Sequence, residues 1–549
     1  MEKIIIYQVF TRLFGNRNTE RVENGTIVEN GCGKFSDFDT ATLRRIKRLG
    51  ANHVWYTGVV RHATCTDYSA HGIPRQTASV VKGCAGSPYA ICDYYDVDPD
   101  LADDVEKRME EWEQLIERTH NAGLKVVMDF VPNHVARQYR SVAKPAGVQD
   151  LGFDDNRNWH FSPQNNFYYC VGEDFVPPCG GNYRESPARA TGNDCFSARP
   201  GVNDWYETVK LNYGIDYCDW SGHPSEHFTP VPDTWDKMTA ILLFWAAKGV
   251  DAFRCDMAEM VPCAFWTYAS RRLKESHPST LLIGEVYNPS LYRAYLAAGF
   301  DYLYDKVGMY DTLRAITCDH CPTSAITAQW QVVDDIRHRM LYFLENHDEQ
   351  RIASDFFAGN AEKAVPALIV AALLQKNPVM VYAGQEFGER GMDKEGFSGV
   401  DGRTSIFDYW CVDTIRRGFY DRKQLTGSEK ALEDTYRKVL NIARSNAAVV
   451  QGGSFDLMYV NPELSHDQYA FVRGNGKKTL LVAVNFCDYE QAVGIVIPSA
   501  AFDYLGMKEG CVEASDLLTG NAVTLDLKRD GAVNITLPAN GVVILNIVR

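Results

Sequence analysis

The segment GVDAFRCDMAE (249–259) places charged residues directly after an apolar run. Arg254 and Asp256 follow Phe253 in a stretch that otherwise resembles a buried strand. Burying a cation or a carboxylate costs free energy unless the charge is paired or takes part in chemistry. The segment therefore indicates either a structural ion pair or a catalytic site, and the ends of the other predicted strands bear on the choice.

Three further apolar runs also end in ionisable side chains or amides. They are KVVMDFV (125–131) with Asp129, Asn133 and His134, LLIGEV (281–286) with Glu285, and RMLYFLEN (339–346) with His347 and Asp348. A single carboxylate after a strand is more often a helix cap than a catalyst. Four such ends that meet at one edge of a sheet would instead form a shared active site.

These residue types suit retaining glycoside hydrolysis. That reaction needs one carboxylate as nucleophile and one carboxylic acid as proton donor, about 5–5.5 Å apart. A neighbouring arginine keeps the nucleophile ionised, and a poorly solvated site raises the pKa of the acid. Imidazoles and a further carboxylate can bind sugar hydroxyls more tightly as the transition state forms. The strand ends therefore favour chemistry over a structural pair.

The elements that position these residues alternate between short apolar runs and helical segments. The spacing of apolar residues predicts helices at, for example, 104–123 and 234–249. Parallel strands need crossover helices, and eight such units close into a (β/α)8 TIM barrel with its active site at the C-terminal strand ends. The eight predicted strands lie at 4–10, 53–59, 125–131, 250–256, 281–286, 300–305, 339–346 and 378–384.

Two parts of the chain depart from this alternation. Residues 135–205 are rich in Asn, Gly, Pro, Tyr and Phe and have no helical period, which predicts an inserted loop domain after strand three. From about 445 the pattern changes to alternating strands with Gly, Asn and Asp turns. We therefore expect a catalytic barrel at 1–134 and 206–444, an inserted domain at 135–205, and a C-terminal all-β sandwich domain at 445–549.

Composition limits the function classes. A net charge of −15 argues against a nucleic-acid or anionic-membrane partner, and the longest apolar stretches are too short to cross a bilayer. Fifteen cysteines without framework spacing indicate reduced thiols. No signal-peptide pattern precedes the first predicted strand, so we expect a cytoplasmic protein if Met1 is the native start.

The strand ends resemble the signatures of the α-amylase family, glycoside hydrolase family 13. The matching stretches occur in the family's order and on the corresponding strands. They are DFVPNH (129–134), FRCD (253–256), GEVY (284–287) and ENHDEQR (345–351), with SPYAICDYYDVDP (87–99) and YAGQEFGE (382–389) as further similar stretches. Each motif alone is weak, but the four together are specific, and the resemblance covers the whole chain.

The resemblance implies a role for each matching residue. Asp256 would be the nucleophile, Glu285 the general acid/base, and Asp348 the stabiliser of the transition state. The substrate would be an α-glucan (starch, glycogen or maltodextrin) cleaved at α-1,4 bonds, and the chemistry would require no cofactor. The other residues implied are Tyr89, His134, Arg254 and His347 in substrate binding and Asp129 in support of Arg254.

The chain departs from the family pattern at two places. Many members follow the nucleophile with a Lys-His pair that binds sugar beyond the cleaved bond, whereas this chain has Glu259 and Met260. The family's calcium often lies between the asparagine of the third-strand motif and an acid of the inserted domain. The matching positions are Asn133 and Asn212, so a structural calcium at these two residues stays open.

Two alternatives remain beside hydrolysis. The same three carboxylates serve a 4-α-glucanotransferase or maltosyltransferase, in which a second sugar replaces water as acceptor. A catalytically silent barrel used for sugar binding is a different class, and the presence of all three carboxylates argues against it. Endo or exo action, chain-length preference, tolerance of α-1,6 bonds and oligomeric state stay open at the level of sequence.

Overall fold

Eight parallel strands close a barrel in a computed structural model that describes residues 2–217 and 223–548. Their order around the barrel is β1-β16-β15-β14-β13-β12-β5-β2. The strands are β1 (Ile5–Phe10), β2 (His53–Thr57), β5 (Lys125–Phe130), β12 (Ala252–Cys255), β13 (Leu281–Gly284), β14 (Tyr302–Tyr304), β15 (Met340–Phe343) and β16 (Val379–Tyr382). Each lies within one of the eight predicted runs, so the predicted (β/α)8 barrel is confirmed.

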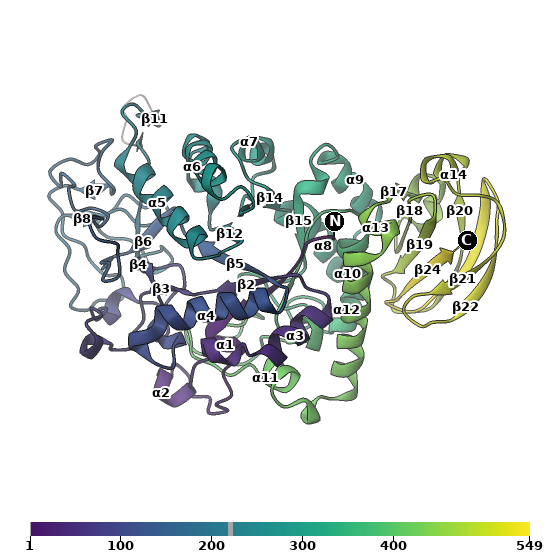
Figure 1. Cartoon of the computed structure of the whole chain (residues 1–549), viewed down its shortest axis with the longest axis horizontal. Coiled ribbons are helices and arrows are strands. Elements are labelled where there is room, and N and C mark those ends of the chain that lie inside the picture. The colour runs from purple at the N-terminus through teal and green to yellow at the C-terminus, as the bar shows by residue number, and fades with distance from the viewer. Residues whose placement is uncertain (1, 218–222, 549) are drawn as a thin grey trace.

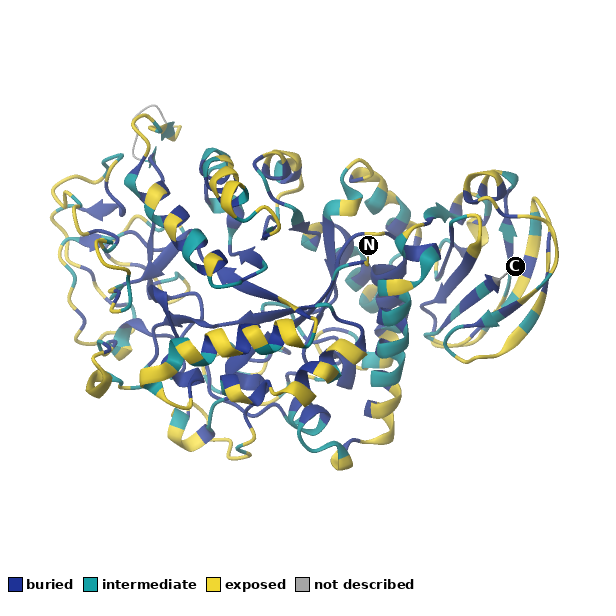
Figure 2. Ribbon diagram, in the orientation of Figure 1, coloured by how far each residue is buried: buried dark blue, intermediate teal, exposed yellow. Residues whose placement is uncertain are grey.

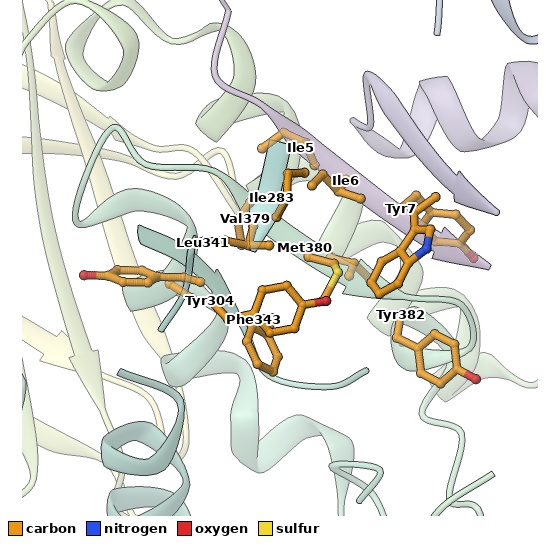
Figure 3. Packing of buried hydrophobic residues seen from close by; sticks show 14 of the residues in the cluster. Ile5, Ile6, Tyr7, Ile283, Tyr304, Leu341, Phe343, Val379, Met380 and Tyr382 are labelled. Atoms are coloured by element: carbon orange, nitrogen blue, oxygen red, sulfur yellow. The ribbon is translucent and has the colours of Figure 1, made fainter. Parts of the chain in front are cut away.

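The strands are buried because helices cover them, and this explains their apolar sequences. Every residue of β1, β2, β12, β15 and β16 is buried. Figure 3 shows side chains such as Ile6, Ile283 and Met380, from different strands, packed together. Figure 2 shows the complement, with exposed residues on the outer faces of the helices and buried residues on the strands.

Helices of the barrel begin and end at residues suited to those positions. In α3 (Thr40–Leu49), for example, the Asp39 side chain accepts a 2.7 Å hydrogen bond from the Thr42 N–H, and Gly50 ends the helix at φ 130°. The other main helices are α4 (Arg108–Asn121), α5 (Asp233–Ala247), α6 (Cys263–Ser276), α7 (Tyr292–Ala297), α8 (Asp311–Asp319), α9 (Ser324–Val332), α10 (Val365–Leu373), α11 (Asp413–Phe419) and α12 (Gly427–Ser445).

Between β5 and α5 the chain forms loops and short antiparallel sheets, at the left of Figure 1. The pairs are β6 (His134–Ala136) with β9 (Thr208–Lys210), β7 (Tyr169–Cys170) with β8 (Ala188–Arg189), and β10 (Ile215–Asp216) with β11 (Ser225–Glu226). The β6–β9 pair joins the start of the range predicted for the insert, 135–205, to residues just after its end. Because β6 begins only four residues after β5 ends, this sheet holds the insert close to the barrel rim.

The C-terminal part is a separate β structure, at the right of Figure 1. Its six-stranded antiparallel sheet has the order β17-β18-β19-β24-β21-β22, beside a two-stranded sheet β20–β23. The strands are β17 (Gly453–Asp456), β18 (Gln468–Gly474), β19 (Lys478–Asn485), β20 (Gln491–Ile497), β21 (Gly510–Asp516), β22 (Ala522–Leu527), β23 (Gly531–Leu537) and β24 (Val542–Val548). The predicted β structure of the C-terminal part is confirmed, and this part also contains a short helix, α14 (Ser499–Leu505).

The C-terminal β structure joins the barrel through hydrogen bonds. Thr323 Oγ1, beside α9, donates to the carbonyl of Gln468 at 2.6 Å, and Arg473 donates to the carbonyl of Leu374 at 2.8 Å.

All fourteen cysteines of the described ranges are free thiols. Within those ranges, no helix has the length and apolar character needed to cross a membrane.

Candidate active site

A cavity of about 390 Å³ lies where β5, β12, β13 and β15 end. Asp256 and Glu285 are 5% and 3% exposed, whereas the Asp348 side chain is 39% exposed and faces solvent. The lining includes five of the predicted site residues, namely Tyr89, His134, Asp256, Glu285 and Asp348. Segments far apart in the sequence therefore converge on one open site.

Arg254 lies at the centre of the charged groups. Its two terminal nitrogens donate to Asp256 Oδ1 at 2.6 Å and contact Glu285 Oε2 at 2.8 Å. The same guanidinium lies 3.6 Å from Asp129 Oδ1 and 3.9 Å from Asp348 Oδ2. Burial opposes the charge of Arg254, but Glu285 and the other anions around it raise its pKa well above the usual value. One permanent cation thus holds two of the carboxylates side by side and faces two more.

The electrostatics favour a site that keeps a proton. Burial raises the pKa of Asp256 well above its usual value; the contact with Arg254 opposes this rise, and Glu285 and Asp348 add to it. Four carboxylates around one guanidinium cannot all ionise without mutual repulsion. The cluster as a whole therefore favours retention of a proton among its carboxyls, and acid-assisted glycoside cleavage needs a carboxyl that can donate one.

Glu285 is held by two donors. The Met257 N–H donates to Oε2 at 2.8 Å, and the Tyr287 hydroxyl donates to Oε1 at 2.6 Å. Met257 has φ 42°, in the left-handed region that residues other than glycine rarely adopt. This conformation directly after Asp256 directs the backbone N–H at the neighbouring strand end, so the chain tolerates local strain to position the carboxyl of Glu285.

On the other side of the cavity, His347 connects Tyr89 to Asp348. Its Nε2 lies 2.5 Å from the Tyr89 hydroxyl and 3.0 Å from Asp348 Oδ2, and its Nδ1 lies 2.7 Å from the side-chain nitrogen of Gln8. Because Gln8 donates to Nδ1, Nε2 carries a proton that Asp348 can accept. Tyr94, five residues after Tyr89, has a different partner: its hydroxyl donates to the carbonyl of Val131, so it is a structural residue.

His134 and Asp129 are buried at the base of the site. Burial, together with the Lys210 and Lys82 ammonium groups, lowers the pKa of His134 to about 3, so its imidazole is neutral at ordinary pH. Asp129 Oδ2 accepts from the Trp55 indole at 3.0 Å, while its Oδ1 faces Arg254. His134 can therefore exchange hydrogen bonds with hydroxyl groups, and Asp129 helps to hold the guanidinium.

The family model "Alpha amylase, catalytic domain" matches residues 8–448. The chain belongs to the alpha-amylase family. It is 26% identical over 397 residues to Alpha-amylase MalA of Haloarcula japonica, a match that covers 71% of this chain and 45% of that protein. The chain thus spans somewhat less than half the length of this relative.

Solved structures of other proteins share the fold. An alpha-amylase from Geobacillus thermoleovorans, complexed with acarbose, aligns with a TM-score of 0.66 at 17% identity, covering 100% of this chain and 98% of that one. AmyP in complex with maltose aligns with a TM-score of 0.64 at 16% identity, covering 99% and 96% of the two chains. Identities this low show a common architecture and do not by themselves transfer a substrate.

Glu259, which stands where many alpha-amylase family members have lysine, is used by the protein itself. Its Oε2 accepts from the N–H groups of Tyr287 at 3.0 Å and Asn288 at 2.9 Å. The carboxylate therefore holds the loop that follows β13 and carries Tyr287. Both hydrogen bonds use Oε2, and a carboxylate has further acceptor sites on its second oxygen.

The two asparagines considered for calcium do not fit a calcium site. Asn133 Oδ1 accepts from the ammonium of Lys210 at 2.9 Å, and Asn212 Oδ1 accepts from the N–H of Gly214 at 2.8 Å. Lys210 also pairs with Asp194 Oδ1 at 2.5 Å. Calcium requires six to eight oxygen ligands, and here a fixed ammonium already occupies the space beside Asn133. In the described part of the chain, no group of three or more His, Cys, Asp and Glu residues could hold a metal.

Several lining residues were not predicted from sequence. Tyr287 stands inside the quoted motif GEVY (284–287), so its position beside Glu285 was a usable signal. Ser87 and Met257 also stand inside quoted stretches, SPYAICDYYDVDP (87–99) and GVDAFRCDMAE (249–259). Thr208 is the first residue of β9. The others come from loops whose folding no local pattern indicates, and they are Lys82, Trp205, Glu207, Ile406 and Phe407.

Proposed function

We propose that this chain is a retaining α-glycosidase that hydrolyses α-1,4-glucosidic bonds of starch, glycogen or maltodextrins. The observation that carries the proposal is the contact of one buried guanidinium, Arg254, with both Asp256 and Glu285 in an open cavity. The family membership, the name alpha-amylase of the relative MalA and the maltose bound to AmyP support the substrate class.

In the proposed first step, the Asp256 carboxylate attacks the anomeric carbon while Glu285 protonates the departing glycosidic oxygen. The bond to the leaving sugar breaks, and a glycosyl ester forms on Asp256. In the second step, Glu285 takes a proton from water, the water oxygen bonds to the anomeric carbon, and the ester bond to Asp256 breaks. Two inversions at one carbon retain its configuration.

The remaining groups serve the charge that develops on the sugar. Asp348, held by His347, binds ring hydroxyls and faces the oxocarbenium-like transition state. Neutral His134 and Tyr89 bind further hydroxyls of the same ring, and Arg254 stays beside Asp256 while its carboxylate is released. These groups supply the nucleophile, the acid and the hydroxyl contacts, so we propose that the chemistry requires no cofactor.

Incubation with maltotriose tests the proposal and separates it from glucanotransfer. Hydrolysis gives only shorter sugars, whose newly formed anomeric centre is α by proton NMR, whereas a transferase also gives longer sugars. Asp256→Asn should lower kcat by at least about 10³-fold. Asp319→Asn, a matched change at an exposed residue remote from the cavity, should leave kcat unchanged. Full activity of Asp256→Asn would refute the assigned nucleophile, and β product would refute retention.

The cytoplasmic location stays a prediction. The cysteines favour it, because the fourteen in the described ranges form no disulfide and five of them are buried. Labelling of the purified protein with a thiol reagent after denaturation, without reductant, checks the redox state.

A further inference from the structure

A buried ion pair lines the cavity beside the catalytic carboxylates and has no part in the mechanism above. Lys82 lies in the loop between β3 (Val60–His62) and β4 (Ile91–Val97), and Glu207 lies just before β9. Their charged groups are 3.1 Å apart, and the residues are 8% and 4% exposed. Desolvating two charges costs free energy that their mutual attraction often does not recover, so a buried pair on the wall of an open cavity indicates a function.

The pair has unused hydrogen-bonding capacity. Within the described ranges, no N–H or O–H donates to Glu207 Oε2 with hydrogen-bond geometry, although the Lys82 ammonium lies near it. Lys82 itself donates to the carbonyl of Asp204 at 3.3 Å and otherwise faces the ring of Tyr206 at 5.2 Å. An ammonium offers three donors and a carboxylate several acceptor sites, so a ligand with vicinal hydroxyl groups can satisfy both.

The Lys82–Glu207 pair lies on the same side of the cavity as His134. Asp256, the proposed nucleophile, therefore lies between this pair and Glu285, the proposed acid. Around the barrel, β5, β12 and β13 are successive neighbours, and His134, Asp256 and Glu285 follow them in that order. Glu207 directly precedes β9, whose residue Lys210 pairs with His134 in the β6–β9 sheet. The general acid must face the leaving group, so the pair lies on the side of the sugar that remains bound.

We propose that Lys82 and Glu207 bind the hydroxyl groups of the glucosyl unit next to the cleaved one, on the non-reducing side. Trp205 adds an aromatic face to the same wall, with its ring centre 5.3 Å from that of His134. The pair thereby determines specificity: it favours substrates that carry at least two sugar units before the cleaved bond. This inference rests on the proposed function and specifies its substrate class.

Release of nitrophenol from 4-nitrophenyl α-maltoside and 4-nitrophenyl α-glucoside tests the inference. The maltoside adds one sugar ring on the side of Lys82 and Glu207, and the leaving group is the same. Lys82→Met and Glu207→Gln should lower kcat/KM for the maltoside about ten- to hundredfold, as expected for lost hydrogen bonds to charged groups, and should lower the maltoside-to-glucoside ratio. Lys82→Arg, which keeps the charge, should recover part of the loss.

Glu185→Gln is the matched control. Glu185 is a buried carboxylate of the same insert, paired with Arg137 at 2.7 Å, and it does not line the cavity. This variant should leave the ratio unchanged, and melting curves of all variants show that they fold. An unchanged ratio in folded, active Lys82→Met and Glu207→Gln would overturn the inference alone. A wild-type enzyme inactive on both glycosides and on maltotriose would overturn the proposed function and the inference with it.

Discussion

Replacing Lys210 with methionine, together with removal of calcium, tests whether an ammonium group takes the structural place that a metal could hold. The Lys210 ammonium donates to Asn133 Oδ1 and pairs with Asp194. If this cation completes the site, the wild-type enzyme needs no calcium for stability. Methionine fills the space of the lysine stem without supplying a donor or a charge, so the change removes the interaction and leaves little cavity.

The magnitude follows from the surroundings of the two partners. Asn133 is 1% exposed, and an amide oxygen left buried without a donor costs about 1–3 kcal/mol. The Asp194 side chain is 42% exposed, so water can replace its partner and the lost ion pair costs at most about 1 kcal/mol. We therefore expect Lys210→Met to lower the free energy of unfolding of the insert and barrel by about 1–4 kcal/mol.

The assay is urea unfolding followed by tryptophan fluorescence, in calcium and in a calcium chelator. The wild-type midpoint should be the same in both, and the Lys210→Met midpoint should be lower by the same amount in both. Lys508→Met, a change of an exposed lysine in the C-terminal domain, should leave the midpoint unchanged. A wild-type midpoint that falls in chelator and recovers with calcium but not magnesium would refute the reasoning.

Two further variants test the charges of the barrel. Arg254→Lys should lower kcat on maltotriose about 10²–10³-fold with little change in melting temperature. The reason is that one ammonium cannot contact Asp256 and Glu285 as a guanidinium fork does. A kcat near the wild-type value would contradict this prediction. Burial raises the pKa of Asp305 from 3.8 to about 6. The folded protein then binds this proton more tightly than the unfolded chain, so the free energy of unfolding of the wild type falls as the pH rises between these values. Asparagine does not ionise, so the free energy of unfolding of Asp305→Asn relative to wild type should rise by up to about 3 kcal/mol by pH 7. Unfolding midpoints across this range measure the difference, and a difference that does not change with pH would count against it.

Most of the barrel could be predicted because its signals are local. Each strand after the first is a short apolar run preceded by a helical segment, and this alternation decides the topology once the strands are parallel. The strand-end residues then follow from the rule that C-terminal ends meet on one face. Arg254, Asp256 and Glu285 could therefore be assigned to one rim from their positions alone, and the structure places them in contact.

The insert could not be predicted in the same way, because its contacts join loops that are distant in sequence. Lys82 and Glu207 meet only when the β3–β4 loop folds against the insert. The contact of Lys210 with Asn133 depends on the register of the β6–β9 pair, which places Lys210 opposite His134. No periodicity indicates that register, and the family resemblance drew attention to Asn212, two residues further on.

The charged end of β12 can now be explained by counting the charges around it. A structural ion pair needs one carboxylate for each guanidinium, and any further buried carboxylate adds repulsion and desolvation cost. Arg254 instead has Asp256 and Glu285 in contact and Asp129 and Asp348 within 3.9 Å. This surplus of acid groups destabilises the fully ionised site and thereby favours a bound proton within the cluster. Because the cluster opens on a cavity and is not sealed in the core, the surplus serves proton transfer to a substrate better than it serves stability.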